Sequence, residues 1–264
     1  CNHVSYMDAL ILAASVPRHM MTYGLSDEAD VRAEAIRQDG ASMRFTLCLP
    51  DGSRMPATLA LPGRHNVQNA LAAASVGWQV GVDPARIVQA LEKFQGIGRR
   101  FNLLAELTTA QGATVQLVDD YGHHPKELKA VFEAARGGWP DKRLVVAFQP
   151  HRYSRTRDLL DDFAAVLSDV DVLVLTEVYA AGEAPVPGVD AEALVEGLKR
   201  RGHRQAAVVT DADALADALA GELRAGEDAL SALLAVPVVT MIIAGGPATI
   251  SQVAPACIAP SNRV

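Results

Sequence analysis

From Phe101 onward, short apolar runs alternate with longer segments in which apolar residues recur at helical spacing. The stretch 125–136 is typical, because Leu128, Val131, Phe132 and Ala135 lie at i, i+3, i+4 and i+7, on one face of a helix. This alternation predicts an α/β fold with a mostly parallel sheet and flanking helices. The predicted strands are 115–118, 144–148, 172–175, 207–210 and 238–244, and the predicted helices are 125–136, 158–167, 191–201 and 212–224, with a weaker one after 244.

The first hundred residues have a different pattern. The stretches 43–48 and 57–61 flank the turn Pro50-Asp51-Gly52-Ser53, which predicts two antiparallel strands. After Gly63 the period becomes helical and predicts an alanine-rich helix over 65–80. A second helix is expected over 84–94, with Asp83 as its N-cap and Pro84 at its first position. The stretch Gly96-Ile97-Gly98 then predicts a hinge, because glycine lacks the steric restriction of a side chain.

Composition narrows the class of protein. The chain has 264 residues, of which 50% are hydrophobic and 21% charged, which is typical of one large or two modest globular domains. A net charge of -7 argues against binding along nucleic acid, because such proteins neutralise phosphates with basic residues. The sequence contains no unbroken run of ~18 apolar residues, so it does not predict a membrane-spanning helix.

The cysteines and the start of the chain carry further expectations. The three cysteines, Cys1, Cys48 and Cys257, include no close pair, so we expect buried apolar residues in a reducing cytoplasm rather than disulfides or zinc ligands. The start is unlike a signal peptide, and its first residue is Cys1 rather than Met. We therefore expect the chain to begin within a longer gene product or to have been trimmed.

Polar side chains gather directly after three of the predicted strands. The clusters are 119–124 (DDYGHH), 149–155 (QPHRYSR) and 177–179 (EVY). In an open parallel sheet, ligands bind outside the carboxyl ends of the strands. The sequence therefore predicts a site at this edge of the sheet.

Within these clusters, Arg152 and Arg155 predict an anion site, because guanidinium groups grip carboxylates and phosphates with paired hydrogen bonds. The alternative is a solvated helix start, which the helix dipole disfavours for positive charge. For His123 and His124 a metal site is not expected, because no third ligand has a typical spacing. We expect one histidine to face the cleft as a donor or base and the other to cap or pack.

Two further pairs leave alternatives open. Asp119 and Asp120 alternate along a strand, so one is expected to hold a ribose or a cation and the other to cap a turn. Asn66 and Asn69 lie three residues apart at a helix start, where they suit either the edge of an adenine or N-capping by Asn66.

Taken together, five stretches in order resemble the Mur ligase family, over residues ~20–190. The Tyr-Gly-His-His-Pro and Phe-Gln-Pro-His-Arg elements are most similar to the members that add L-alanine. A recycling ligase that attaches a tripeptide is similar and is the alternative within the family. The stretches are 63–73 (GRHNVQNALAA), 94–101 (FQGIGRRF), 118–125 (VDDYGHHP), 148–156 (FQPHRYSRT) and 178–185 (VYAAGEAP).

The resemblance implies a division of the chain into two parts. Residues 1–98 would be the tail of the family's central ATP-binding domain, and 99–264 its complete, Rossmann-like last domain. The central domain's phosphate loop, which ends in Gly-Lys-Thr/Ser, does not occur in this sequence. The resemblance places that loop and the Mg²⁺ ligands upstream of Cys1, in a missing N-terminal half.

The resemblance also assigns roles to individual residues. His65, Asn66 and Asn69 would contact the adenine of ATP, Arg100 would reach ATP from the domain junction, and Asp120 would bind its ribose. The amino-acid pocket and reacting groups would be formed by Tyr121, His123, His151, Arg152 and Arg155. Of these, His123, Arg152 and Arg155 would be catalytic.

The implied function is ATP-dependent ligation of L-alanine to UDP-N-acetylmuramate through an acyl phosphate, in peptidoglycan synthesis in the bacterial cytoplasm. This chain would be a fragment, inactive alone. A non-catalytic binding module is the alternative from another class, and an unpaired sheet edge in 1–98 would count against it. The segment Ala244-Gly245-Gly246-Pro247-Ala248-Thr249 departs from the family pattern, and no role is carried over from it.

Overall fold

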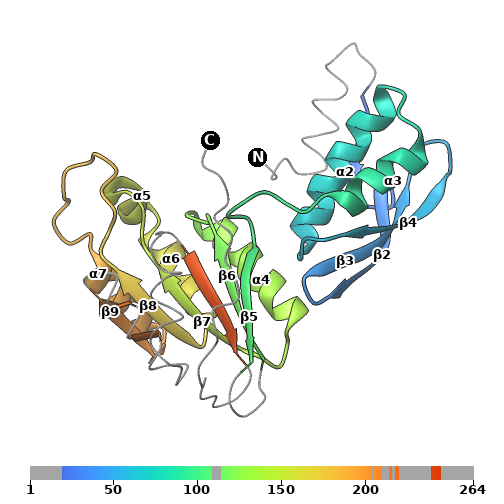
Figure 1. Ribbon diagram of the computed structural model, residues 1–264. Coiled ribbons are helices and arrows are strands. Elements are labelled where there is room, and N and C mark those ends of the chain that lie inside the picture. Colours follow the sequence, from blue (N-terminus) through green and yellow to red (C-terminus); the bar gives the residue numbers. More distant parts are fainter. Residues whose placement is uncertain are drawn as a thin grey trace. The chain divides into compact units, whose positions relative to one another are not determined.

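The computed structural model describes residues 20–108, 114–203, 205–209, 214–215, 218–219 and 239–244 (Figure 1). The chain divides into two compact units. The first consists of the described residues up to Ala60 together with Arg64–Phe94, and the second of Leu61–Gly63 together with the described residues from Gln95 onward. The glycine pair predicted as a hinge follows this boundary directly.

The first unit contains a sheet of order β1-β2-β3-β4. Its strands are β1 (Tyr23–Gly24), β2 (Val31–Asp39), β3 (Ser42–Cys48) and β4 (Arg54–Leu59). The predicted hairpin is confirmed, because β3 and β4 pair antiparallel from Met43 opposite Leu59 to Cys48 opposite Arg54. Cys48 is buried and makes no disulfide.

Strand β2 was not predicted. Its alternation places Val31 and Ala33 in the core, which is the expected pattern of a half-buried strand. The alternation is then interrupted by a bulge between Glu34 and Arg37, where Ala35 has a φ of 49°. The bulge leaves only a short stretch of alternating apolar and polar residues from which a strand could be predicted.

The described residues of the first unit also form helices α2 (Arg64–Gln79) and α3 (Pro84–Lys93), as predicted. Helix α2 packs on β1 and β2 through Val67, Leu71 and Ala74, and α3 packs on β4. The Asp83 side chain accepts a hydrogen bond from the Ala85 N–H at 2.9 Å, which confirms the predicted cap.

The second unit contains a sheet of order β5-β6-β10-β7-β8-β9 among its described residues (Figure 1). Strands β6, β7, β8 and β9 run in one direction, as the sequence predicts. Strand β10 pairs antiparallel with both β6 and β7, and β5 is antiparallel at the edge. The strands are β5 (Asn102–Thr108), β6 (Thr114–Asp120), β7 (Arg143–Phe148), β8 (Val172–Thr176), β9 (Ala206–Val209) and β10 (Val239–Ala244).

Helices α4 (Pro125–Gly138), α6 (Leu160–Leu167) and α7 (Ala191–Arg200) contribute to one hydrophobic core. The predicted helix 158–167 starts earlier and is divided, because α5 (Tyr153–Asp158) ends before Leu159. The predicted helix 212–224 lies largely outside the described residues, as do the weaker helix after 244, Cys1 and Cys257. None of the described helices is long and apolar enough to cross a membrane.

The sheet of this unit is buried on both faces. Leu144, Val146 and Phe148 of β7 pack into the core formed with α4, α6 and α7, whereas Val145 and Ala147 belong to a second core on the other face. Two-sided burial explains why the strands are continuous apolar runs rather than alternating ones. It also fixes the carboxyl ends of β6, β7 and β8 at one edge of the sheet.

We predict that the two glycines near the unit boundary differ in their tolerance of a side chain. Gly96 has a φ of +88°, and a Cβ there would lie 2.8 Å from Leu61 Cδ2, whereas a Cβ at Gly98 would meet nothing within 4 Å. Gly96→Ala should lower the free energy of unfolding by about 1–3 kcal/mol, since it adds left-handed strain and overpacking. The matched control Gly98→Ala should change it by at most about 1 kcal/mol. Equal urea midpoints for the two variants would contradict this.

Candidate active site

The polar clusters after β6, β7 and β8 meet at one edge of the sheet. Beyond β7 and β8 the chain continues side by side, because His151 and Tyr179 form a parallel bridge. The Arg152 N–H donates to the Tyr179 carbonyl and the Tyr179 N–H donates to the Pro150 carbonyl, each at 2.8 Å. The two loops are therefore held like an extension of the sheet.

Four rings form a continuous row along this edge. The ring centroids of Tyr121 and His123 are 5.3 Å apart, those of His123 and His151 6.1 Å, and those of His151 and Tyr179 5.3 Å. Tyr121 and Tyr179, at the ends of this ring row, are 38% and 51% exposed. The row thus presents two imidazoles between two accessible phenols. Tyr179 belongs to the predicted cluster 177–179, although the sequence analysis assigned it no role of its own.

Positive charge gathers beside the ring row. Arg155 Nη1 lies 3.4 Å from His151 Nδ1 and donates to the His151 carbonyl at 3.2 Å. Burial lowers the pKa of His151, and the charges of Arg155, His123 and Arg152 lower it further. A neutral imidazole next to two guanidinium groups is a suitable environment for an anionic ligand.

Arg152 has an unusual backbone conformation. Its φ of 73° lies in the left-handed region, where a side chain is strained, and it occupies the N-cap position of α5 without a side-chain cap. The buried Thr156 hydroxyl donates to the Arg152 carbonyl at 2.9 Å, and the Tyr179 carbonyl accepts from the Arg152 N–H. The contacts around Arg152 stabilise this conformation.

Glu183 is a site residue that the sequence analysis missed. Its Oε2 accepts from the Ser154 N–H at 2.9 Å, its Oε1 accepts from the Ser154 hydroxyl at 2.7 Å, and it lies 3.9 Å from Arg152 Nη1. These Ser154 hydrogen bonds lower the pKa of Glu183. The only available signal was its place in the stretch 178–185, which carried no assigned role.

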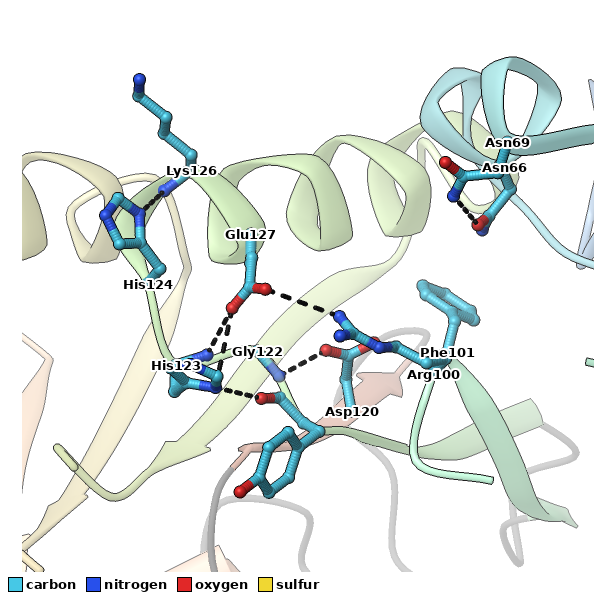
Figure 2. Close-up of polar contacts among 11 residues, drawn as sticks. Asn66, Asn69, Arg100, Phe101, Asp120, Gly122, His123, His124, Lys126 and Glu127 are labelled. Atoms are coloured by element: carbon cyan, nitrogen blue, oxygen red, sulfur yellow. Dashed lines mark hydrogen bonds and ion pairs between the residues drawn. The ribbon is translucent and has the colours of Figure 1, made fainter. Parts of the chain in front are cut away.

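Asp120 is 3% exposed, and both of its carboxylate oxygens accept backbone hydrogen bonds (Figure 2). Oδ2 accepts from the Phe101 N–H at 2.8 Å and Oδ1 from the Gly122 N–H at 2.6 Å. Burial raises the pKa of Asp120, although these bonds oppose the rise. Asp120 therefore fixes the turn after β6 to the start of β5, and its expected contact with a ribose stays a prediction.

Asp119 has different partners. Its Oδ2 lies 3.5 Å from Arg99 Nε, and the Arg99 guanidinium carbon lies 4.7 Å from the centroid of the Tyr121 ring. Burial raises the pKa of Asp119 against the charge of Arg99. The ion pair and the cation–π contact together place Arg99 against one end of the ring row.

Glu127, in the first turn of α4, joins two predicted site residues (Figure 2). Its Oε2 accepts from the His123 N–H at 3.1 Å, and its Oε1 lies 3.7 Å from Arg100 Nη1. Burial would raise the pKa of Glu127, but the hydrogen bond from His123 and the nearby positive charge lower it. His124 accepts from the Lys126 N–H at 3.3 Å, which confirms the prediction that one histidine caps this helix.

The structure brings together Tyr121, His123, His151, Arg152 and Arg155 at one edge of the second unit. His65, Asn66 and Asn69 lie at the start of α2, in the first unit. The Asn69 amide donates to Asn66 Oδ1 at 3.4 Å, so the two amides share a face. Asn66 is the third residue of α2, so the alternative that it is the N-cap is wrong. Among the residues that the structure describes, no group of three or more His, Cys, Asp or Glu could hold a metal ion.

We predict that Asp120 contributes more to stability than Asp119. Asp120→Asn replaces one acceptor oxygen with an NH₂ group that faces a backbone N–H, which should cost about 1–3 kcal/mol of unfolding free energy. Asp119→Asn, the control, weakens one partly exposed ion pair and should cost less than about 1 kcal/mol. Urea unfolding of both variants measures the difference, and an Asp120→Asn midpoint at or above that of Asp119→Asn would refute this role.

A second prediction concerns pH. The folded state lowers the pKa of His151 from its ordinary 6.5, so between the two values the unfolded chain binds more protons. The contribution of His151 to stability should therefore be complete above about pH 6.5 and be lost as the pH falls below it. Urea midpoints measured across this window should fall less steeply for His151→Gln than for the unsubstituted chain. Parallel curves would show that His151 does not contribute.

Comparison with known proteins gives consistent matches. The family model described as "Mur ligase, glutamate ligase domain" matches residues 99–233, and "Mur ligase middle domain" matches residues 3–77. The UDP-N-acetylmuramate–L-alanine ligase of Xanthomonas oryzae pv. oryzae is 65% identical over 216 residues, and that of Xanthomonas campestris pv. campestris is 62% identical. Each match covers 82% of this chain and 45% of the relative, so the chain spans about half the length of these relatives.

Solved structures show the same fold. The UDP-N-acetylmuramate-alanine ligase of Thermotoga maritima is 28% identical with a TM-score of 0.60, covering 75% of this chain and 41% of that one. MurF of Acinetobacter baumannii has the same TM-score at 22% identity, covering 83% and 44%, and this likeness concerns the fold alone.

Proposed function

The chain belongs to the Mur ligase family, and on that premise we propose that it is the amino-acid-binding part of an ATP-dependent ligase that joins L-alanine to UDP-N-acetylmuramate in the bacterial cytoplasm. The observation that carries the proposal is the meeting of Arg152 and Arg155 with His151 and the ring row at the edge of the sheet. The names of the relatives at 62–65% identity support L-alanine as the amino acid.

In this proposal, residues 1–98 belong to the central domain of the ligase and 99–264 form its last domain. His65, Asn66 and Asn69 contact the adenine of ATP, Arg100 reaches ATP and Asp120 binds its ribose. The sequence lacks the Gly-Lys-Thr/Ser loop that grips the phosphates, and no cluster of described residues suits Mg²⁺. Charge neutralisation at the phosphates is what Mg²⁺ supplies when bound, and we assign no residue of this chain to it.

The proposed reaction has two steps. The lactyl carboxylate of UDP-N-acetylmuramate attacks the γ-phosphate of ATP, which forms an acyl phosphate and releases ADP. The amine of L-alanine then attacks the acyl carbon, which forms the amide bond and releases phosphate. Arg152 and Arg155 would hold the alanine carboxylate or the charge that develops on the phosphate, His151 would line this anion pocket as a neutral imidazole, and Tyr121 would form its wall. His123 would accept the proton that the amine loses. Such a site works by positioning reactants and stabilising charge, and needs no covalent enzyme intermediate.

The test is a chimera in which this chain replaces the matching segment of the Xanthomonas oryzae relative. We expect L-alanine-dependent phosphate release from Mg-ATP and UDP-N-acetylmuramate, and none from this chain alone. Release that depends on a tripeptide instead would favour a recycling ligase. A folded chimera that binds L-alanine but releases no phosphate with either acceptor would favour a binding module.

Arginine variants of this chimera test the anion pocket. Arg152→Ala or Arg155→Ala should lower kcat/KM for L-alanine by roughly 10- to 100-fold, as expected when a charge-assisted hydrogen bond to a carboxylate or phosphate is lost. Arg157→Ala is the matched control, because Arg157 follows on the same helix and pairs with Asp158 at 2.8 Å. An equal loss of kcat/KM in all three variants would show that Arg152 and Arg155 do not form the anion pocket.

A further inference from the structure

Among the residues that the structure describes, the polar contacts of one ring nitrogen of His123, Nδ1, are hydrogen-bond acceptors. Nδ1 lies 3.0 Å from the Tyr121 carbonyl oxygen and 3.7 Å from Glu127 Oε2. A carbonyl oxygen and an ionised carboxylate cannot donate, and the lowered pKa of Glu127 keeps its carboxyl group ionised. The favourable arrangement therefore has the ring proton on Nδ1.

A neutral imidazole carries one N–H, so a proton on Nδ1 leaves the lone pair on Nε2. The hydrogen bonds that the two ring nitrogens make decide which of them carries the proton. The tautomer of His123 is thus determined by the Tyr121 carbonyl and Glu127, and Nε2 is the atom able to accept a proton.

We propose that Glu127 is a positioning residue that, together with the Tyr121 carbonyl, holds His123 in the Nδ1–H tautomer with Nε2 as the proton acceptor for the attacking amine. This deepens the proposed function and rests on it for the identity of the amine. As the amine nitrogen bonds to the acyl carbon and phosphate leaves with the C–O electron pair, the amine proton passes to His123 Nε2. The imidazolium that forms then lies beside the Glu127 carboxylate.

Glu127 is well placed for this role. It is the third residue of α4, where a carboxylate interacts favourably with the helix dipole, and its hydrogen bond to the His123 N–H fixes the backbone that carries the ring (Figure 2). Its other oxygen is 3.7 Å from Arg100 Nη1. The same carboxylate therefore connects the proposed base with the arginine proposed to meet ATP.

The competing explanation is that Glu127 only stabilises the start of α4, as in a capping box. Glu127→Gln separates the two, because the amide oxygen can still accept the His123 N–H while the negative charge is lost. A purely structural role would change thermal stability but not the position of the ring proton. The matched control is Glu133→Gln, which removes an exposed carboxylate from the same helix, 4.0 Å from Lys129.

The experiment is a long-range ¹H–¹⁵N correlation spectrum of the imidazole rings, recorded on this chain at alkaline pH, where an imidazole is neutral. The His123 signal is assigned by its loss in His123→Gln. We expect His123 to be mainly the Nδ1–H tautomer, and Glu127→Gln to shift the tautomer ratio toward Nε2–H by roughly threefold, the effect of an exposed ion pair. Glu133→Gln should leave the ratio unchanged.

Two results would overturn the proposal. An Nε2–H tautomer in the unsubstituted chain would show that Nε2 is not the acceptor. An Nδ1–H tautomer that Glu127→Gln leaves unchanged would assign the effect to the Tyr121 carbonyl alone. Neither readout depends on turnover, so failure of the chimera to use L-alanine would refute the proposed function and leave the tautomer result standing.

Discussion

The arrangement of the site depends on one buried carboxylate. Asp120 binds the backbone N–H of Phe101 with one oxygen and that of Gly122 with the other, which joins the entry to β5 and the exit from β6. Burying a charge is costly, and here two backbone donors offset part of that cost. The turn they fix carries Tyr121 and His123, so both rings start from a rigid base. A side chain at position 122 would meet Asp120 Oδ1 at 2.9 Å, so glycine is needed there.

Around this turn, arginine side chains are paired with carboxylates that are themselves held in place. Ser154 holds Glu183 beside Arg152, and Glu127 meets Arg100 from the start of α4. The closest atoms of these two pairs lie 3.9 and 3.7 Å apart, farther than in a direct hydrogen bond. Such contacts orient a guanidinium group without saturating its donors. The guanidinium groups of these arginines therefore have a fixed orientation and still have donors that can bind an anion.

Much of this could be read from the sequence, and the reasons for the omissions are physical. Helical periodicity located α4, and two-sided burial produced the apolar runs of β7 and β8. The split at Leu159 left no clear signal, and the bulge after Glu34 obscured β2. The antiparallel place of β10 between β6 and β7 could not be read, because strand order depends on contacts far apart in sequence. Strand ends predicted that Tyr121, His123 and His151 would gather at one edge, which the ring contacts show, whereas Glu127 and Glu183 needed three-dimensional partners to be recognised.

The position of β10 also has a consequence for how the chain acquires its structure. Strands β6 and β7 do not pair with each other, because β10 lies between them. Strand β10 begins only at Val239, although β7 ends at Phe148. During synthesis, the two halves of this sheet therefore remain without their central hydrogen-bonding partner until β10 emerges. Such distant pairing slows folding and exposes strand edges to other chains in the meantime. A ribosome-bound nascent chain that stops short of β10 would be a natural substrate for molecular chaperones.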